Sequence, residues 1–204
     1  MIAIVDYGAG NLESVVRAFH KLGAEATITA DPECVLSAER IILPGVGFFD
    51  KAMAMLRETG IADTLHRRVM GEGTPLLGIC LGFQMFCAHS DEGDAAGLAW
   101  LDARVERLPD AAGKIPHIGW NDLAWQPQHP WGTGLCEGAC FYFAHSYCVS
   151  GADIAGTAAT CSYGSTFPAA FQRGNLFGTQ FHPEKSHGNG LQLLKNFLDL
   201  TARA

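Results

Sequence analysis

Residues 75–86 read PLLGICLGFQMF, and this stretch decides how the chain folds. The apolar run before Cys80 predicts a buried strand, and the residues after it continue in a helical pattern. Cys80 stands at the turn between them, flanked by Gly78 and Gly82. This is the pattern of a nucleophile elbow, with a thiol where hydrolases usually carry a serine. The glycines suit a strained, crowded turn, and the helix N-terminus behind Cys80 favours the thiolate.

The segments around this elbow predict an α/β protein. Continuous apolar strands that alternate with helices indicate a parallel sheet covered on both faces. The third strand is expected to stop at Pro44-Gly45. After about residue 98, short runs separated by turn signals predict an additional antiparallel strand region. We therefore expect one domain over residues 1–204, with a mixed, largely parallel central sheet. The expected strands are 2–5, 26–29, 40–43 and 75–80, and then runs at 104–106, 141–143, 169–171 and 176–181; the expected helices are 11–22, 50–58, 61–70 and 189–202.

Composition excludes several classes of function. The chain has 204 residues and a net charge of −7, with no basic run, so nucleic acid is not expected as the main ligand. No apolar stretch is long enough to cross a membrane, and the N-terminal run reads as a strand and not as a signal peptide. Seven irregularly spaced cysteines indicate free thiols in a reducing, cytoplasmic setting. No cofactor is expected.

Four segments are expected at the carboxyl edge of the sheet, where ligands bind in such folds. They are residues 6–11, 44–47, 78–82 and 182–184. The last of them supplies a base and its orienting group. Pro183 keeps His182 out of the helical region, so in an extended segment the side chains of His182 and Glu184 point the same way. The sequence thus predicts a Cys80–His182–Glu184 triad.

An acyl-transfer site also needs donors for the oxyanion. The backbone N–H of Leu81, directly after the nucleophile, is one candidate. The turn Gly45-Val46-Gly47 offers a second, from Val46 or Gly47.

Other residues compete for these roles. His117 and His145 have functional-looking neighbours and are the rival bases. The remaining buried cysteines are expected to be inert. Cys136 and Cys140 form a C-x3-C pair, but no second pair of ligands accompanies them, so no metal site is expected.

The segments 78–84, GICLGFQ, and 181–184, FHPE, resemble the triad (class I) glutamine amidotransferase family over nearly the whole chain. The resemblance implies a flavodoxin-like class I amidotransferase fold that hydrolyses L-glutamine to glutamate and passes the ammonia to a partner. It further implies that substrate is bound by Gly45, Gly47, Gln84, Ser146 and Tyr147.

Within that family, other segments are similar to the glutaminase subunits of imidazole glycerol phosphate synthases. These are residues 5–12, 43–47, 116–121 and 182–186. The similarity implies a role in histidine biosynthesis and a heterodimer with a separate (β/α)8-barrel cyclase subunit. It also implies that Asn11, Trp120 and Lys185 lie near that partner. Gly119 and Asn121 beside Trp120 suggest a loop. The alternative for Trp120 is a core aromatic, and the alternative for Lys185 is a lysine exposed to solvent.

Two other functions stay open at this point. The chain could serve another biosynthetic amidotransferase, or act as a stand-alone cysteine hydrolase on esters, lactones or γ-glutamyl peptides. A non-catalytic binding module on the same fold is a third possibility, disfavoured by the complete set of Cys80, His182 and Glu184.

Overall fold

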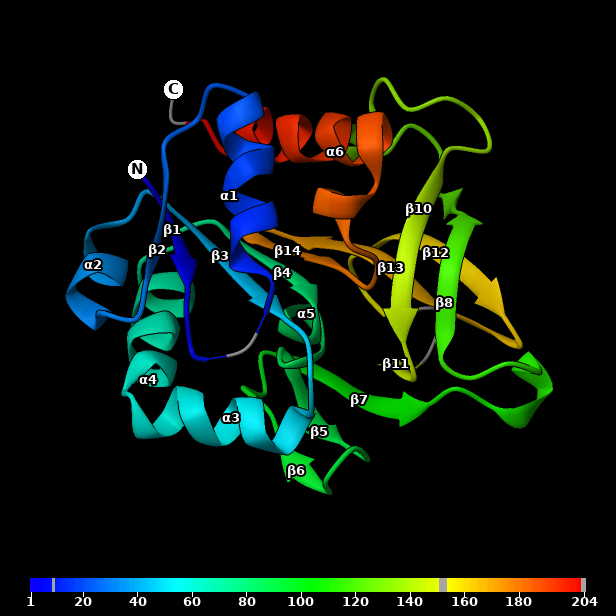
Figure 1. Cartoon of the computed structure of the whole chain (residues 1–204), viewed down its shortest axis with the longest axis horizontal. Coiled ribbons are helices and arrows are strands. Elements are labelled where there is room, and N and C mark those ends of the chain that lie inside the picture. Colours follow the sequence, from blue (N-terminus) through cyan, green and yellow to red (C-terminus); the bar gives the residue numbers. More distant parts are fainter. Residues whose placement is uncertain (9, 151–153, 203–204) are drawn as a thin grey trace.

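A computed structural model describes residues 1–8, 10–150 and 154–202. Its centre is an eight-stranded sheet in the order β2-β1-β3-β4-β14-β13-β12-β9 (Figure 1). The strands of this sheet are β1 (Ile2–Val5), β2 (Ala26–Thr29), β3 (Arg40–Gly45), β4 (Leu76–Cys80), β9 (Ala124–Trp125), β12 (Thr157–Tyr163), β13 (Ser165–Arg173) and β14 (Leu176–Thr179).

The five strands from β2 to β14 run parallel, which confirms the expected parallel half. Their carboxyl ends lie at one edge, and β1, β3, β4 and β14 lead into the four segments that carry the candidate residues. The expected stop of β3 at Pro44-Gly45 is wrong, since both residues pair with β4. Pairing of β3 with β1 has already ended at Ile42, so Pro44 lies where a missing N–H donor is tolerated.

Helices cover both faces of the parallel half. On one face, α1 (Leu12–Lys21) and α6 (His187–Leu200) pack Phe19 and Phe197 into the same core as Ile4. On the other face, α3 (Phe49–Glu58) and α4 (Ile61–Leu65) pack against the side of β1 that carries Ala3 and Val5. The alternation of Ile4 with Ala3 and Val5 between the two cores shows that β1 is buried on both sides.

The helices differ from the expected ones in three places. The expected helix 61–70 changes after α4 to the wider π-helical turn η1 (His66–Gly71). A short helix α2 (Pro32–Ser37) was not expected, although Asp31 caps it by accepting from the N–H of Glu33. The helix after the elbow, α5 (Leu81–Gln84), is only one turn long.

The antiparallel part is confirmed and is more extensive than expected. Two smaller sheets accompany the central one, in the orders β10-β8 and β11-β7-β5-β6. Their strand pairs are antiparallel except β5 with β7, which is parallel. Trp120 lies in β8 and pairs with Tyr142 of β10, so the expected loop at Trp120 is wrong. The remaining elements are β5 (Cys87–Ser90), β6 (Ala95–Ala96), β7 (Leu101–Arg107), β8 (His117–Asp122), β10 (Cys140–His145) and β11 (Tyr147–Val149), with 3-10 turns η2 (Asp110–Ala112), η3 (Pro130–Gly132) and η4 (Pro183–Lys185).

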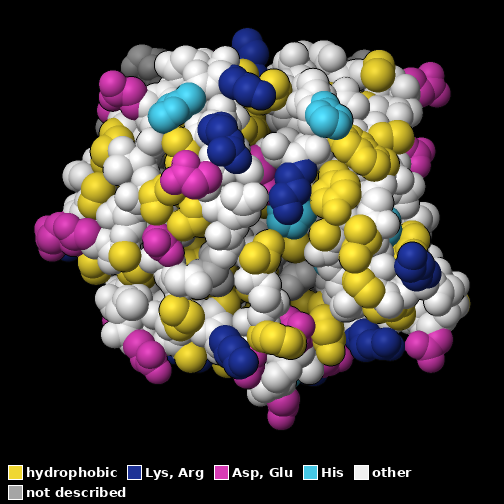
Figure 2. Space-filling model, viewed as in Figure 1, with side chains coloured by type: hydrophobic (Ala, Val, Ile, Leu, Met, Phe, Trp, Pro, Cys, Tyr) yellow, Lys and Arg dark blue, Asp and Glu magenta, His cyan; other side chains and the backbone are white. Residues whose placement is uncertain are grey.

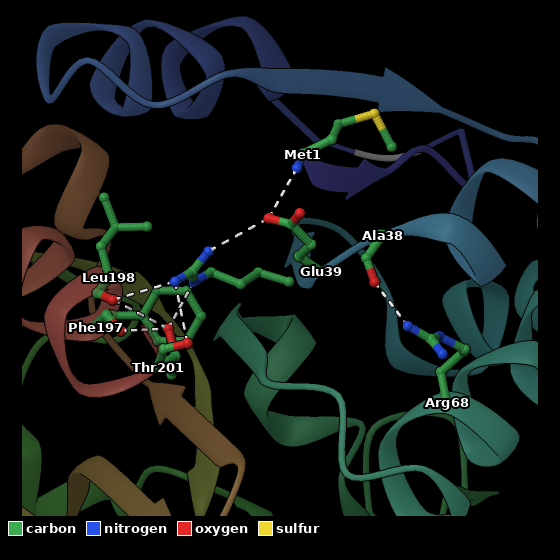
Figure 3. A network of polar contacts seen from close by, with 8 residues as sticks. Met1, Ala38, Glu39, Arg68, Phe197, Leu198 and Thr201 are labelled. Atoms are coloured by element: carbon green, nitrogen blue, oxygen red, sulfur yellow. Dashed lines mark hydrogen bonds and ion pairs between the residues drawn. The ribbon is translucent and has the colours of Figure 1, made fainter. Parts of the chain in front are cut away.

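The two ends of the described chain are tied to the start of β3 (Figure 3). The Arg40 guanidinium donates to Thr201 Oγ1 at 2.7 Å and to the carbonyl of Thr201 at 3.0 Å. The Met1 ammonium donates to Glu39 at 3.1 Å, beside it. Arg40 thereby places a cation at the C-terminal end of α6, where the helix dipole is negative.

Among the residues that the structure describes, no helix combines the length and apolar character needed to cross a membrane.

Candidate active site

The elbow forms as the sequence predicts, with Cys80 at the end of β4 and directly before α5. Cys80 has φ +55°, a left-handed backbone that only tight surroundings maintain. A Cβ on Gly82 would lie 1.7 Å from the carbonyl oxygen of Leu43, and one on Gly78 would lie 2.7 Å from the N of Phe83. Both glycines are therefore required by close backbone approach, which is the reason for the G-x-C-x-G pattern.

His182 and Glu184 form a buried pair beside this elbow. Their Nδ1 and Oε1 atoms are 2.8 Å apart, and each side chain is only 3% exposed. Burial by itself lowers the pKa of His182, but the negative charges of Cys80 and Glu184 and the hydrogen bond to Glu184 outweigh it and raise the pKa to about 10. The Nε2 atom of His182 is buried and has no hydrogen-bond partner among the described residues. It is the ring nitrogen left for proton exchange.

The local backbone around Glu184 differs from the expected one. His182 is extended, but Glu184 lies in the 3-10 turn η4 and not in an extended segment. The two side chains meet across that turn. Ser186, which the sequence analysis missed, anchors it by donating to the His182 carbonyl at 2.6 Å and accepting from the Tyr142 N–H at 3.0 Å. His182 is thus fixed to β10 through its own backbone as well, because its N–H donates to the Tyr142 carbonyl at 2.9 Å.

A cavity of about 80 Å³ lies over Cys80 and collects most of the expected substrate residues. It does not include Gly45, which borders a smaller cavity shared with His182, Glu184, Asn11 and Lys185. The cavity over Cys80 is lined by Val46, Gly47, Cys80, Leu81, Gln84, Glu92, Ala144, His145, Ser146 and Tyr147. A larger cavity of about 420 Å³ lies between β9 and η3 and holds none of the expected site residues.

The segment from Pro44 to Gly47 is fixed at its first residues and has open space around its last. The Tyr7 hydroxyl donates to the Pro44 carbonyl at 2.9 Å, and a Cβ on Gly45 would lie 2.4 Å from that hydroxyl. Gly47 has φ +111° with open space around its Cα, and Val46 is 40% exposed. A change in the orientation of the Val46–Gly47 peptide is therefore compatible with the surroundings, whereas Gly45 is fixed.

The rival bases are both buried and committed to other hydrogen bonds. His145 Nδ1 lies 2.9 Å from the carbonyl oxygen of Tyr147, which can only accept, so this nitrogen carries the proton. His145 Nε2 lies 3.1 Å from His117 Nδ1. Burial lowers the pKa of His145 to about 3 and that of His117 to about 4. Although His145 borders the cavity, its nitrogens are occupied, and this leaves His182 as the available base.

Two polar residues near Cys80 escaped the sequence analysis. Glu92 lines the cavity and accepts from the N–H of Phe49 at 3.0 Å. Burial raises its carboxyl pKa. Gln180 is fully buried, and its Nε2 lies 3.6 Å from Cys80 Sγ. Glu92 belongs to the acidic stretch Asp91-Glu92-Gly93, which resembles one in the family but does not reveal that Glu92 faces Cys80. Gln180 stands two positions before His182, the spacing of one face of a strand.

The expected partner residues share one surface with the site. Asn11 is exposed and Lys185 half-buried; together they border the small cavity at Gly45. Trp120 is 48% exposed and stacks on His187 with ring centroids 5.1 Å apart, so it is not a core aromatic. Lys185 Nζ lies 5.8 Å from the ring centroid of Tyr142.

A basic groove of about 260 Å³ adjoins this surface, between α1 and the start of α6. Arg17, Lys21 and Lys185 line it, and Figure 2 shows Lys and Arg side chains gathered there with hydrophobic side chains beside them. None of the three cations forms an ion pair within the part of the chain that the structure describes.

Cys80 is the cysteine that lines the cavity beside Gln84, and the other six cysteines line neither this cavity nor the small one at Gly45. Burial raises the pKa of Cys87, Cys148 and Cys161 to about 12, so their thiols stay protonated and inert near neutral pH. The described residues contain no group of three or more His, Cys, Asp or Glu side chains that could hold a metal ion, at Cys136 and Cys140 or elsewhere.

Comparison with known proteins places this geometry in a family. A family model of glutamine amidotransferase class-I matches residues 3–200. Imidazole glycerol phosphate synthase subunit HisH 2 of Pseudomonas aeruginosa is 45% identical, over 98% of this chain and all of that protein. Subunit HisH of Chloroflexus aurantiacus is 47% identical, over 97% of this chain and 95% of that protein.

Solved structures agree on the fold. A glutamine amidotransferase crystal structure superposes with a TM-score of 0.76 at 23% identity, over 98% of this chain and 99% of that one. The structure of PurLQS from Thermotoga maritima superposes with a TM-score of 0.75 at 21% identity, over 98% of each chain. The chain therefore belongs to the class-I glutamine amidotransferases and, within them, to the family of imidazole glycerol phosphate synthase HisH subunits.

Proposed function

We propose that this protein is the glutaminase subunit of an imidazole glycerol phosphate synthase, and that Cys80, His182 and Glu184 are its catalytic triad. The observation that carries the assignment is the elbow cysteine beside a buried His–Glu pair whose free nitrogen has no other partner. A single domain, residues 1–204, holds all three groups.

The chemistry follows from these positions. His182 takes the Cys80 proton through Nε2, and the thiolate attacks the side-chain carbonyl carbon of L-glutamine. The Leu81 N–H, at the start of α5, and a second N–H from Val46 or Gly47 stabilise the oxyanion. His182 then protonates the leaving ammonia, and a thioester on Cys80 remains. Water, deprotonated by His182, hydrolyses the thioester to glutamate.

The cavity also offers partners for the α-groups of glutamine. Glu92 is its single carboxylate, so it is suited to the α-ammonium group. The backbone of Ser146 and Tyr147 is suited to the α-carboxylate, and Gly45, Gly47 and Gln84 complete the substrate contacts. Gln84 Nε2 is already bonded to the Tyr147 carbonyl at 2.7 Å and to Gln180 Oε1 at 3.0 Å, which leaves Gln84 Oε1 as its acceptor for substrate.

A partner subunit consumes the ammonia. The names of the relatives describe subunits of a synthase, and the sequence resemblance indicates a (β/α)8-barrel cyclase for histidine biosynthesis in the cytoplasm. We place that partner on the face that carries Asn11, Trp120 and Lys185. Exposed Ile118 and Trp120 offer apolar contact, and the adjacent basic groove offers charge for an acidic surface.

Partner binding would also regulate the oxyanion turn. Gly47 tolerates two peptide orientations, and a β-branched residue there does not. Gly47→Val is expected to abolish partner-stimulated hydrolysis while Cys80 remains open to alkylation. Unchanged stimulated turnover would remove this role for the turn.

The test of the function is glutamate release from L-glutamine by the protein alone, and then with a cyclase subunit and its nucleotide substrate. A low rate alone that rises strongly in the mixture supports the synthase assignment. Equal rates point to another amidotransferase or to a stand-alone hydrolase, and no Cys80-dependent release in either condition contradicts the proposal.

A further inference from the structure

Gln180 contacts the sulfur of Cys80 from a fully buried position. Its Nε2 lies 3.6 Å from Cys80 Sγ, a normal length for a hydrogen bond to sulfur. Its backbone is fixed as well, because the Gln180 N–H donates to the Ala169 carbonyl at 2.9 Å. Gln180 therefore reaches the nucleophile from a rigid strand end.

Neighbouring hydrogen bonds determine which end of the Gln180 amide faces the sulfur. Gln84 contacts the Tyr147 carbonyl, which accepts only, so the atom of Gln84 at that contact is its NH2 group. The same NH2 group donates to Gln180 at 3.0 Å, and so the Gln180 atom there is Oε1. The remaining end of Gln180, its NH2 group, faces Cys80. One backbone carbonyl thus fixes the orientation of both amides.

We propose that Gln180 is a positioning residue that holds the Cys80 thiolate in place by donating an amide hydrogen to Sγ. The inference rests on the proposed role of Cys80 as nucleophile. Gln180 transfers no proton, since the thiol proton goes to His182 and the amide keeps both of its own. A donor at a buried sulfur favours the charged thiolate over the thiol. It also fixes the direction of Sγ on a residue whose backbone is already strained.

Two variants of Gln180 separate donation to sulfur from support of Gln84. Gln180→Glu keeps an acceptor for Gln84 but replaces the donor at Sγ with an acceptor. Gln180→Met removes both contacts and keeps an unbranched side chain of similar size in a buried position. The charge-matched control is Gln192→Glu on α6, where the Gln192 side chain donates to Asn196 Oδ1.

The readout is the pH dependence of iodoacetamide alkylation at Cys80, followed by mass spectrometry of the Cys80 peptide, with thermal melting to check folding. We expect Gln180→Glu to raise the midpoint of the pH dependence of Cys80 alkylation by about one pH unit, which lowers the alkylation rate near pH 7 about tenfold. Gln180→Met is expected to give a smaller rise, and Gln192→Glu none. The midpoint belongs to the coupled Cys80–His182 pair.

Two results overturn the proposal. One is an alkylation midpoint equal to that of the wild type in both Gln180 variants. The other is an unchanged midpoint in Gln180→Glu together with a raised midpoint in Gln180→Met, which would assign Gln180 the role of holding Gln84. Should Gln180→Glu fail to fold, an unchanged midpoint in Gln180→Met still excludes donation to Sγ. Glutamate release by the wild-type protein is measured separately, so loss of the proposed function is distinguishable from loss of this role for Gln180.

Discussion

The parallel and antiparallel halves of the molecule contribute differently to the site. The parallel half supplies Cys80, His182 and the turn at Gly47, all at the carboxyl ends of buried strands. The antiparallel part supplies Ser146 and Tyr147, which line the cavity, and Trp120 on the exposed face. The candidate reactive groups thus lie at the ends of buried strands, whereas the groups assigned to substrate and partner are drawn from both parts of the molecule.

The two halves also treat histidine in opposite ways. In the parallel half, His182 is paired with a carboxylate and its pKa is raised to about 10. In the antiparallel part, His145 and His117 are buried against each other and form no ion pair with a described carboxylate, and burial lowers their pKa values to about 3 and about 4. The pKa of the same side chain is raised in one region and lowered in the other. Measurements on each region can test this contrast.

The largest expected effect lies at the nucleophile. Cys80→Ala should reduce glutamate release by at least about four orders of magnitude, because the step through the thiolate is lost. The matched control is Cys87→Ala, a buried cysteine outside the cavity, which should keep the turnover of the folded protein. Residual turnover in Cys80→Ala close to that of the wild type would assign the chemistry elsewhere.

Backbone crowding at the elbow should make the parallel half intolerant of a single methyl group. Gly82→Ala is expected to lower the free energy of unfolding by about 3 kcal/mol or more, since the added Cβ would overlap the Leu43 carbonyl. Gly71→Ala, where nothing lies within 4 Å of the added atom, should be nearly neutral. Urea unfolding of both variants measures the difference, and equal stability would show that the elbow can relax.

The histidine pair of the antiparallel part should set the acid sensitivity of the fold. The pKa values of His145 and His117 in the folded protein lie below the ordinary 6.5. At a pH between the folded and the ordinary value, the unfolded chain therefore binds more protons than the folded one. The contribution of the two histidines to the free energy of unfolding is complete above pH 6.5. It is lost as the pH falls toward 4, by at most about 1.4 kcal/mol per pH unit for each group. His182 has the opposite sign: its contribution is complete below pH 6.5 and is lost as the pH rises toward about 10.

Urea unfolding of the wild type, His145→Gln and His117→Gln between pH 4.5 and 7 checks this, at roughly half-unit pH steps. Both variants should show a flatter pH dependence than the wild type. His20→Gln, at an exposed position of α1, is the control. An unchanged slope in both variants would mean that the buried pair does not control acid stability.

The smallest expected effect concerns the tie between β3 and the end of α6. Arg40→Met removes the hydrogen bonds to Thr201 and should cost about 1–2 kcal/mol of unfolding free energy. Lys195→Met removes an exposed ion pair with Asp199 and should cost less than about 0.5 kcal/mol. A smaller loss for Arg40→Met than for Lys195→Met would show that this tie is not structural.

The parallel half was largely predictable because its strands are buried on both faces and read as apolar runs. Strands β1 and β2 begin and end where the sequence predicts. In the antiparallel part, β5, β6, β8, β9, β11 and β12 were missed. Strands β6 and β9 have only two residues each, and β8 is buried at only one of its six positions, so their segments lack the apolar runs of the parallel half. Strand β8 shows the difficulty: Gly119 and Asn121 beside Trp120 suggest a loop, and only pairing with β10 makes this segment a strand.

By itself, the sequence determined the elbow, the parallel sheet, the identity of the nucleophile candidate and the two residues that complete the predicted triad. These depend on local patterns: apolar runs, crowded glycines, and spacing within a few residues. The tertiary structure decided which histidine is free to act, because only packing reveals that His145 is bonded to Tyr147 and His117. It also decided that Gln180 and Glu92 lie beside Cys80, since contacts between segments far apart in the chain are set by the fold.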